Sequence, residues 1–383
     1  MNERARPEYD PIGLRAGGFF VYPEVTVTEV FRDNIFYTPS DKEEDFITVI
    51  SPSLRMQSNW NVHSLTFYAD ADYGRYLINE DESYVDWRTG IDGRLDIERD
   101  LNFAGGVSAA RLHEPRSSPD QTGAAEPVTY HRYSGDAALT KRFNRLSTRL
   151  GGEVDVYRYN DVPASGGGTF NSDDRDRTVS EGSLRLGYEV SPNIEPFVRT
   201  SVNDRSYRQS SDDFGTKRDS WGWEAVAGTA FDLGGVTYGE VYVGYLEQRY
   251  DSASLDTISG LSFGGNLIWN PTRLTTVTLG AERTVEETTL SGASGGLQTM
   301  LKAQVDHELL RNLILSGDAR YARLNYNGIS REDDTADAGL SLRYLIDRNF
   351  ELRAGYSFAT RNSSVSSADY DTQTLFLGLT AQF

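Results

Sequence analysis

Residues 85–98 read VDWRTGIDGRLDIE, and their side chains alternate in character from one position to the next. The odd-numbered positions, from Val85 to Ile97, carry mainly apolar or small side chains. Every even-numbered position, from Asp86 to Glu98, is charged or glycine. Because successive side chains of a β-strand point to opposite faces, this stretch predicts a strand with one apolar and one charged face.

The same period of two recurs along the chain, at residues 65–73, 297–309, 350–358 and 375–383. Strands of globular proteins are usually about five to six residues long, and these stretches are longer. A long strand with one charged, wet face and one apolar face of mixed small and large residues is typical of a transmembrane β-barrel. The sequence therefore predicts an all-β fold, a transmembrane antiparallel up-and-down β-barrel.

Composition excludes several other classes of protein. The 383 residues contain no run of about 18 apolar side chains, which excludes a helical membrane protein. The 22 Tyr and 17 Phe are too many for a disordered acidic chain. The net charge of −19 argues against nucleic acid as a partner, since phosphates are bound by Lys and Arg. Without cysteine, the chain has no disulfide framework and no thiolate metal site.

Short connections rich in Asn, Asp, Gly and Pro alternate along the chain with longer polar ones. Eight short and nine long connections join about 18 strands, an even number, as in bacterial single-chain barrels. Short turns of such barrels face the periplasm and long loops face the outside, so we expect both termini in the periplasm. Residues 1–17 are predicted to form a periplasmic N-terminal arm and residues 18–383 the outer-membrane barrel.

A barrel of about 18 strands should enclose a water-filled lumen. The alternation assigns many charged side chains to the lumen face. These lumen-facing candidates are Arg55, Asp70, Asp72, Asp86, Arg88, Asp92, Arg94, Arg149, Glu153, Asp155, Arg185, Arg199, Glu224, Lys302, Asp306, Asp318, Arg320, Arg343 and Arg353. They could form cross-strand ion pairs that stiffen the wall, each worth ~0–1 kcal/mol when hydrated. They could also form a constriction that selects solutes by charge.

The two ends of the chain bear on targeting. At the C-terminus, Leu379, Ala381 and Phe383 resemble the terminal signal read by the barrel-assembly machinery, although Leu377 stands where a polar residue is usual. Residues 1–18 contain no apolar segment of an export signal. We therefore expect a mature chain whose export signal has been removed, located in the bacterial outer membrane. Its expected partners are outer-membrane lipid, lipopolysaccharide and the barrel-assembly machinery.

The opening of the chain resembles a known family. Residues 6–36 read RPEYDPIGLRAGGFFVYPEVTVTEVFRDNIF, and this stretch, together with residues 45–75, is similar to the start of mature proteins of the putative β-barrel porin 2 family of Gram-negative bacteria. The resemblance implies an outer-membrane barrel. Because members are commonly associated with exopolysaccharide or capsule gene clusters, it also implies a role in polymer export.

No motif for catalysis or metal binding was found in the sequence. The four histidines have no metal-ligand spacing, so we expect no metal site, no cofactor and no enzymatic activity. A hydrolase at the outer rim built on His113 or His131 is a remote alternative, since no third catalytic group is identifiable.

Three functions remain open. The leading hypothesis is a water-filled conduit for exopolysaccharide or capsule polymer, docked on periplasmic polysaccharide export components. The first alternative is a general diffusion porin for small hydrophilic solutes. A constricting loop folded into the lumen would favour the porin, whereas an unobstructed or arm-gated bore would favour export. The second alternative is a structural or adhesive outer-membrane protein with a closed lumen.

Overall fold

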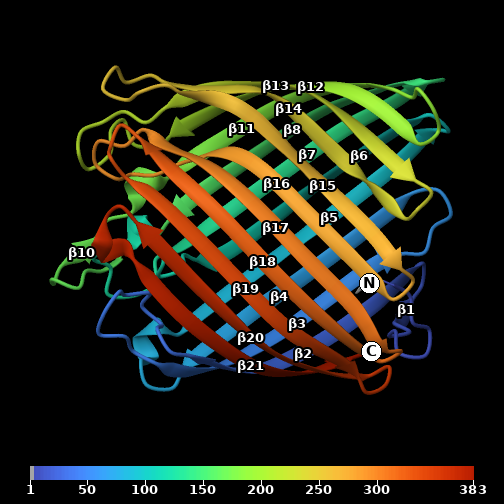
Figure 1. Cartoon of the computed structure of the whole chain (residues 1–383), viewed down its shortest axis with the longest axis horizontal. Helices are drawn as coiled ribbons and strands as arrows, with labels where there is room; N and C mark the ends of the chain where they lie inside the picture. Colours follow the sequence, from blue (N-terminus) through green and yellow to red (C-terminus); the bar gives the residue numbers. More distant parts are fainter. Residues whose placement is uncertain (1–3) are drawn as a thin grey trace.

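A computed structural model describes residues 4–383 and shows a closed antiparallel barrel with strongly tilted strands (Figure 1). Its wall consists of 18 strands, seven from β2 to β8 and eleven from β11 to β21. The wall strands are β2 (Phe19–Arg32), β3 (Asp45–Ser58), β4 (Ser64–Tyr76), β5 (Tyr84–Glu98), β6 (Leu101–His113), β7 (Thr129–Phe143), β8 (Leu146–Tyr159), β11 (Arg177–Tyr188), β12 (Ile194–Tyr207), β13 (Ser220–Leu233), β14 (Thr237–Tyr250), β15 (Ile258–Thr272), β16 (Thr275–Glu286), β17 (Gly295–Leu310), β18 (Leu313–Asn327), β19 (Glu332–Leu345), β20 (Phe350–Ser363) and β21 (Tyr370–Gln382).

The last strand closes the barrel on the first. β21 pairs with β2 in antiparallel register from Glu24–Gln382 to Arg32–Thr374. This pairing satisfies the backbone groups that an open sheet edge would expose to lipid. The predicted fold class and strand number are therefore confirmed.

The smaller elements lie at the two ends of the wall. Near the N-terminus, β1 (Leu14–Ala16) pairs with the start of β2, so the last part of the predicted arm is joined to the sheet. At the opposite end, the long loops contain the hairpin β9 (Val162–Pro163) and β10 (Thr169–Phe170), and four single turns of 3-10 helix. These turns are η1 (Glu80–Glu82), η2 (Pro119–Gln121), η3 (Asp173–Arg175) and η4 (Ser366–Ala368). Within residues 4–383, no helix is both long and apolar enough to cross a membrane.

The burial pattern is the reverse of that in a soluble protein. Large apolar side chains on the outer face are exposed, for example Val107 (63%) and Leu340 (60%). Polar side chains on the inner face are buried, for example Asp306 (4%) and Glu351 (1%). A wall of this kind requires lipid outside and water or polar groups inside.

The lipid-facing assignment can be tested on two neighbouring residues of β19. Leu340→Arg places a charge on the exposed apolar face near the middle of the strand and should destabilise the barrel by ~2–4 kcal/mol. Ser341→Arg points to the opposite face and should cost much less, because the charge meets water. Urea unfolding in lipid vesicles measures both, and equal costs would contradict the assignment.

Candidate functional site: the pore and the loop across its mouth

The inner wall carries a network of ion pairs, most of them between different strands. Arg185 contacts Glu240 at 2.6 Å, Arg320 contacts Asp337 at 2.8 Å and Arg199 contacts Glu224 at 3.2 Å. Further contacts join Arg88 to Asp70, Arg94 to Asp96, Arg132 to Asp155, Lys302 to Glu282, and both Arg343 and Arg353 to Glu351. The lumen therefore combines charges of both signs along its wall.

Other candidates bind neutral or weakly basic groups. Asp72 accepts a hydrogen bond from Ser51 at 2.5 Å, and Asp306 accepts one from Ser316 at 2.6 Å. Asp86 lies 2.8 Å from Nδ1 of His113. Glu153 lies on β8 two residues from Asp155 and on the same face of the strand.

Four of the predicted lumen-facing residues form no ion pair within the described part of the chain. Within residues 4–383, no ion pair joins Arg55, Asp92, Arg149 or Asp318 to another side chain. All four side chains point to the same face of the wall as the paired candidates. Each stands an even number of residues from a paired candidate on its own strand, or lies opposite such a position on the neighbouring strand. Their charges are the ones most available to a passing solute.

The long loop between β6 and β7, residues 114–128, does not continue the wall. It contains Pro115, Pro119 and Pro127, which lack the N–H that a strand ladder needs. The single turn η2 forms at its centre. Its last residue, Val128, is completely buried, and Gln121 is 3% exposed. The loop is therefore packed inside the molecule rather than extended into solvent.

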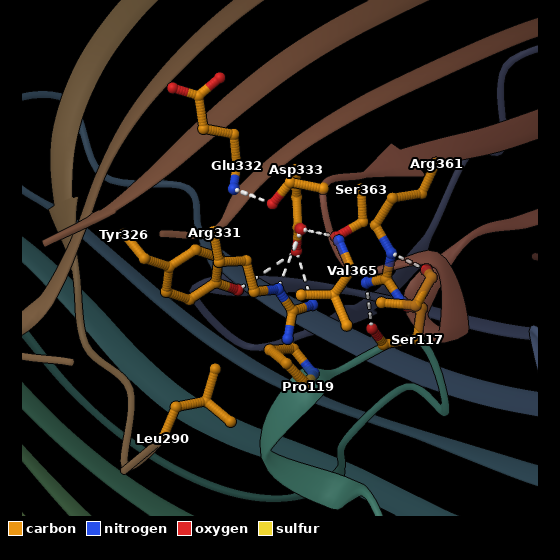
Figure 2. A network of polar contacts seen from close by, with 12 residues as sticks. Ser117, Pro119, Leu290, Tyr326, Arg331, Glu332, Asp333, Arg361, Ser363 and Val365 are labelled. Atoms are coloured by element: carbon orange, nitrogen blue, oxygen red, sulfur yellow. Dashed lines mark hydrogen bonds and ion pairs between the residues drawn. The ribbon is translucent and has the colours of Figure 1, made fainter. Parts of the chain in front are cut away.

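The loop crosses the mouth of the barrel. Nη1 of Arg361 on β20 donates a hydrogen bond to the carbonyl oxygen of Ser117 at 2.7 Å (Figure 2). Asp120 accepts hydrogen bonds from Thr288 Oγ1 at 2.8 Å and from the backbone N–H of Thr289 at 3.2 Å. Six wall strands, β8 and β11 to β15, separate β7 from β16, so the β16–β17 loop lies across the ring from the loop's origin.

One end of this crossing loop is fixed by Arg116. Its guanidinium forms two hydrogen bonds with Glu82, which is only 4% exposed, and two with the carbonyl oxygens of Ala124 and Ala125 at 2.8 Å. A guanidinium with four acceptors in a fixed fork geometry holds the loop in one conformation.

At the start of η2, the loop lies beside a polar network formed by Arg331 and by residues of β19 and β20 (Figure 2). Arg331 donates to Asp333 at 2.8 and 3.0 Å, and Ser363 donates to the same carboxylate at 2.6 Å. Arg361 also donates from Nε to the carbonyl oxygen of Ala368 at 2.7 Å. The bond to Ala368 orients the Arg361 guanidinium toward Ser117.

A second buried cluster lies on the other side of the mouth. Glu287, just past the end of β16, binds Arg205, and it accepts a hydrogen bond from Tyr207 at 2.6 Å. Burial acts to raise the pKa of Glu287, but the guanidinium groups of Arg205 and Arg177 and the Tyr207 hydroxyl hold it below its ordinary value. Glu287 is therefore ionised, and it anchors the β16–β17 loop to the inner face of β12.

One loop carboxyl should make the packing of the mouth depend on pH. Burial, and then the nearby Asp213 carboxylate, raise the pKa of Asp174 to about 6. In an opened loop the same group ionises near its ordinary value of about 3.9. Loop packing should therefore weaken as the pH rises from about 4 to about 6, because ionisation is favoured only in the open form. Asp174→Asn should remove this dependence, as measured by protease cleavage of residues 160–176 between pH 4 and 7. Cleavage that changes equally in both proteins would contradict it.

The described part of the N-terminal arm packs on the short turns of the barrel. Arg6 is 1% exposed and forms an ion pair with Glu308 at 3.0 Å. Arg348 donates to the carbonyl oxygen of Pro7 at 2.9 Å, and Arg311 lies 3.7 Å from Glu8. The arm thus covers part of the rim at the short-turn end.

The remaining predicted residues fall as follows. Leu379 and Phe383 of the expected assembly signal are exposed on the outer face and Ala381 is half-buried, and the backbone N–H of Phe383 donates to Pro23. His113 lies against the Tyr84 ring and Asp86, whereas the His131 ring stacks on Tyr133. The sequence identified residues 114–126 as a long polar connection, but it did not predict the crossing of the mouth. The three prolines of the loop were the available signal in the sequence.

Comparison with known proteins agrees with this architecture. The sequence model of a family described as Putative beta-barrel porin 2 matches residues 6–383. A search of curated proteins found no match. Among solved structures, a BenF-like porin from Pseudomonas fluorescens Pf-5 is 9% identical with a TM-score of 0.50, over 95% of this chain and 99% of that one.

Two further solved structures are similar in the same way. OpdK from Pseudomonas aeruginosa, crystallised with vanillate, is 12% identical with a TM-score of 0.47, over 95% of this chain and 99% of that one. OccAB3 from Acinetobacter baumannii is 11% identical with a TM-score of 0.48, over 96% and 100%. At these identities the likeness is one of fold.

Proposed function

The chain belongs to the putative β-barrel porin 2 family, and from this premise we propose that it is a general diffusion porin for small hydrophilic solutes. Family membership and the 18-strand barrel indicate an outer-membrane channel protein rather than an enzyme. The observation that supports the finer function is the loop at residues 114–128, which crosses the mouth and binds groups on the far wall.

Such a loop limits the size of the solutes that can pass. A folded loop held by Arg361 and Thr288 narrows the mouth, which should obstruct a continuous polymer more than small molecules. The mixed charges of the wall replace the hydration of a polar solute on its way through. Export of exopolysaccharide or capsule polymer, our leading expectation from the sequence, has no support in the fold or in the porin relatives.

Conductance and solute uptake separate the porin from the two alternatives. If the chain is a porin, the purified protein in planar bilayers should show stepwise ion conductance, and proteoliposomes should swell in arabinose but not in a polysaccharide of several kilodaltons. Conductance without a size limit would favour the export conduit. A barrel that folds in lipid but never conducts would favour the closed protein.

We also propose that the arm, residues 4–13, narrows the periplasmic exit. The ion pair between Arg6 and Glu308 lies inside the rim, where both side chains are buried. The Glu308→Gln variant should loosen the arm and increase conductance slightly, because a charge-assisted bond becomes a neutral one.

A further inference from the structure

The outer halves of β15 and β16 are not paired. β15 pairs with β14 up to Ile258, but its ladder with β16 ends at Gly264, opposite Glu282. This seam has seven register pairs, whereas β16 and β17 have twelve. Residues 258–263 therefore have a strand neighbour on one side only. In Figure 1 the ribbons of β15 and β16 separate toward the end that carries the long loops.

Beyond this fork, β16 leaves the wall and turns inward. Glu287 follows its last residue and binds Arg205 and Tyr207 on β12. Three strands, β13, β14 and β15, lie between β12 and β16 in the sheet. The end of β16 must therefore pass over the inner faces of these strands to reach β12.

The neighbouring β17 overlaps the inside of β15 at the rim. A Cβ atom placed at Gly295 would lie 3.1 Å from Cδ1 of the buried Ile258, and one at Gly260 would lie 3.5 Å from Cδ2 of Leu297. Asn327 donates one amide hydrogen bond to the carbonyl oxygen of Thr257 at 3.2 Å. Van der Waals contacts and side-chain bonds thus replace the backbone ladder, and such contacts separate more easily than paired strands.

An open apolar groove lies on the outer face of the wall, beginning beside the fork and extending to β19. It has a volume of about 760 Å³, within the range of about 300–1,000 Å³ typical of ligand sites. Exposed Leu301 and Tyr321 of the lipid face border it, with small residues such as Ala303 and Ala319 between them. On the opposite, lumen face of β17, the ammonium group of Lys302 pairs with Glu282 at the point where the β15–β16 ladder ends.

We propose that the β15–β16 fork is a lateral port, through which a single-chain amphiphile of the fatty-acid class passes between the lumen and the outer membrane. The groove accepts the alkyl chain because its lining is apolar and faces the bilayer. The charged pair at the fork accepts the polar head. The overlap of β17 on β15 closes the port when it is empty. The port requires an open lumen, as the proposed porin function does, but it does not depend on which hydrophilic solutes pass through that lumen.

The chain contains no cysteine, so a disulfide can lock the overlap without side reactions. Gly260→Cys/Leu297→Cys joins β15 to β17 across the seam. Met300→Cys/Ala322→Cys is the matched control, because these residues are register partners in the intact β17–β18 ladder. Both pairs are expressed in a bacterium that lacks its own fatty-acid channel, and uptake of radiolabelled oleate is measured before and after reduction.

Oxidised Gly260→Cys/Leu297→Cys should take up no oleate above background, and dithiothreitol should restore uptake, while the control transports in both states. Ala303→Trp, which fills the groove, should also reduce oleate uptake, whereas Val198→Trp on the distant lipid face should not. Arabinose swelling of proteoliposomes should persist in every variant, which shows a folded channel. Equal oleate uptake in the oxidised and reduced states, or no oleate uptake by the native chain despite normal swelling, would overturn the port.

Discussion

Replacing residues 115–127 by a short Gly-Ser linker is expected to raise single-channel conductance several-fold. This segment is attached at the far side of the mouth through Ser117 and Asp120, so its removal opens the cross-section that it now occupies. Conductance through a pore is limited by its narrowest part, and the loss of that part affects all small ions alike. Planar-bilayer recording gives the conductance, and liposome swelling gives the new size limit for sugars.

The control for this deletion is a loop change that leaves the mouth untouched. The β9–β10 hairpin packs on the crossing loop, because the backbone N–H of Ser165 donates to the carbonyl oxygen of Gly123 at 2.8 Å, but Gly166 at its tip has no atoms in the space that a Cβ would occupy. Gly166→Ser, which keeps the hairpin contact, should leave conductance and size limit unchanged. If the 115–127 variant conducts like the native protein, the crossing loop is not the constriction and the proposed porin mechanism fails.

A weaker change tests whether the loop limits conductance by its fixed position or merely by being present. Arg361→Met keeps every loop residue but removes the donor to Ser117 and the contact with Ala368. The loop should then fluctuate between its crossing position and open ones, because the other anchor through Asp120 remains. We expect frequent opening and closing steps in the current trace rather than a uniformly larger conductance.

Much of the barrel could be predicted from the sequence because the bilayer imposes a strict rule on each strand. Every second side chain of a strand must be apolar, as at Val107 and Leu340, and the strand must be long enough to cross the membrane. These constraints are local, so they can be recognised in one strand at a time. The pairing of β2 with β21 follows from the closure of the barrel, since a barrel leaves no edge.

The mouth could not be predicted in the same way, because its contacts join residues far apart in the chain. Asp120 and Thr288 are 168 residues apart, and Arg361 and Ser117 are 244 apart. No periodic pattern relates such pairs, and a polar loop has the same composition whether it folds inward or extends outward. The fork at Gly264 was missed for a related reason: β15 and β16 both alternate normally, and only the register shows where their pairing ends.

The second large effect is expected at the buried ion pair of the mouth, where Asp212→Ala should open the loop packing. Nε of Arg218 donates to Asp212 at 2.7 Å, and the two side chains are 2% and 1% exposed. The same guanidinium donates to the carbonyl oxygens of Thr288 and Ala293 at 2.6 and 3.0 Å. Removal of the carboxylate leaves a buried cation without a counter-charge, which costs ~3–5 kcal/mol.

Hydrogen exchange of residues 287–294 measures this cost as the free energy of local opening. Asp212→Leu/Arg218→Met should cost less than Asp212→Ala alone, since no unpaired charge remains buried. Lys217→Ala serves as the exposed comparison. Its ion pair with Asp251 is 48% exposed on both sides and should contribute ~1 kcal/mol or less. If Asp212→Ala were as mild as Lys217→Ala, the mouth would be held by its many weak contacts, and the buried pair would only orient Arg218 toward the loop carbonyls.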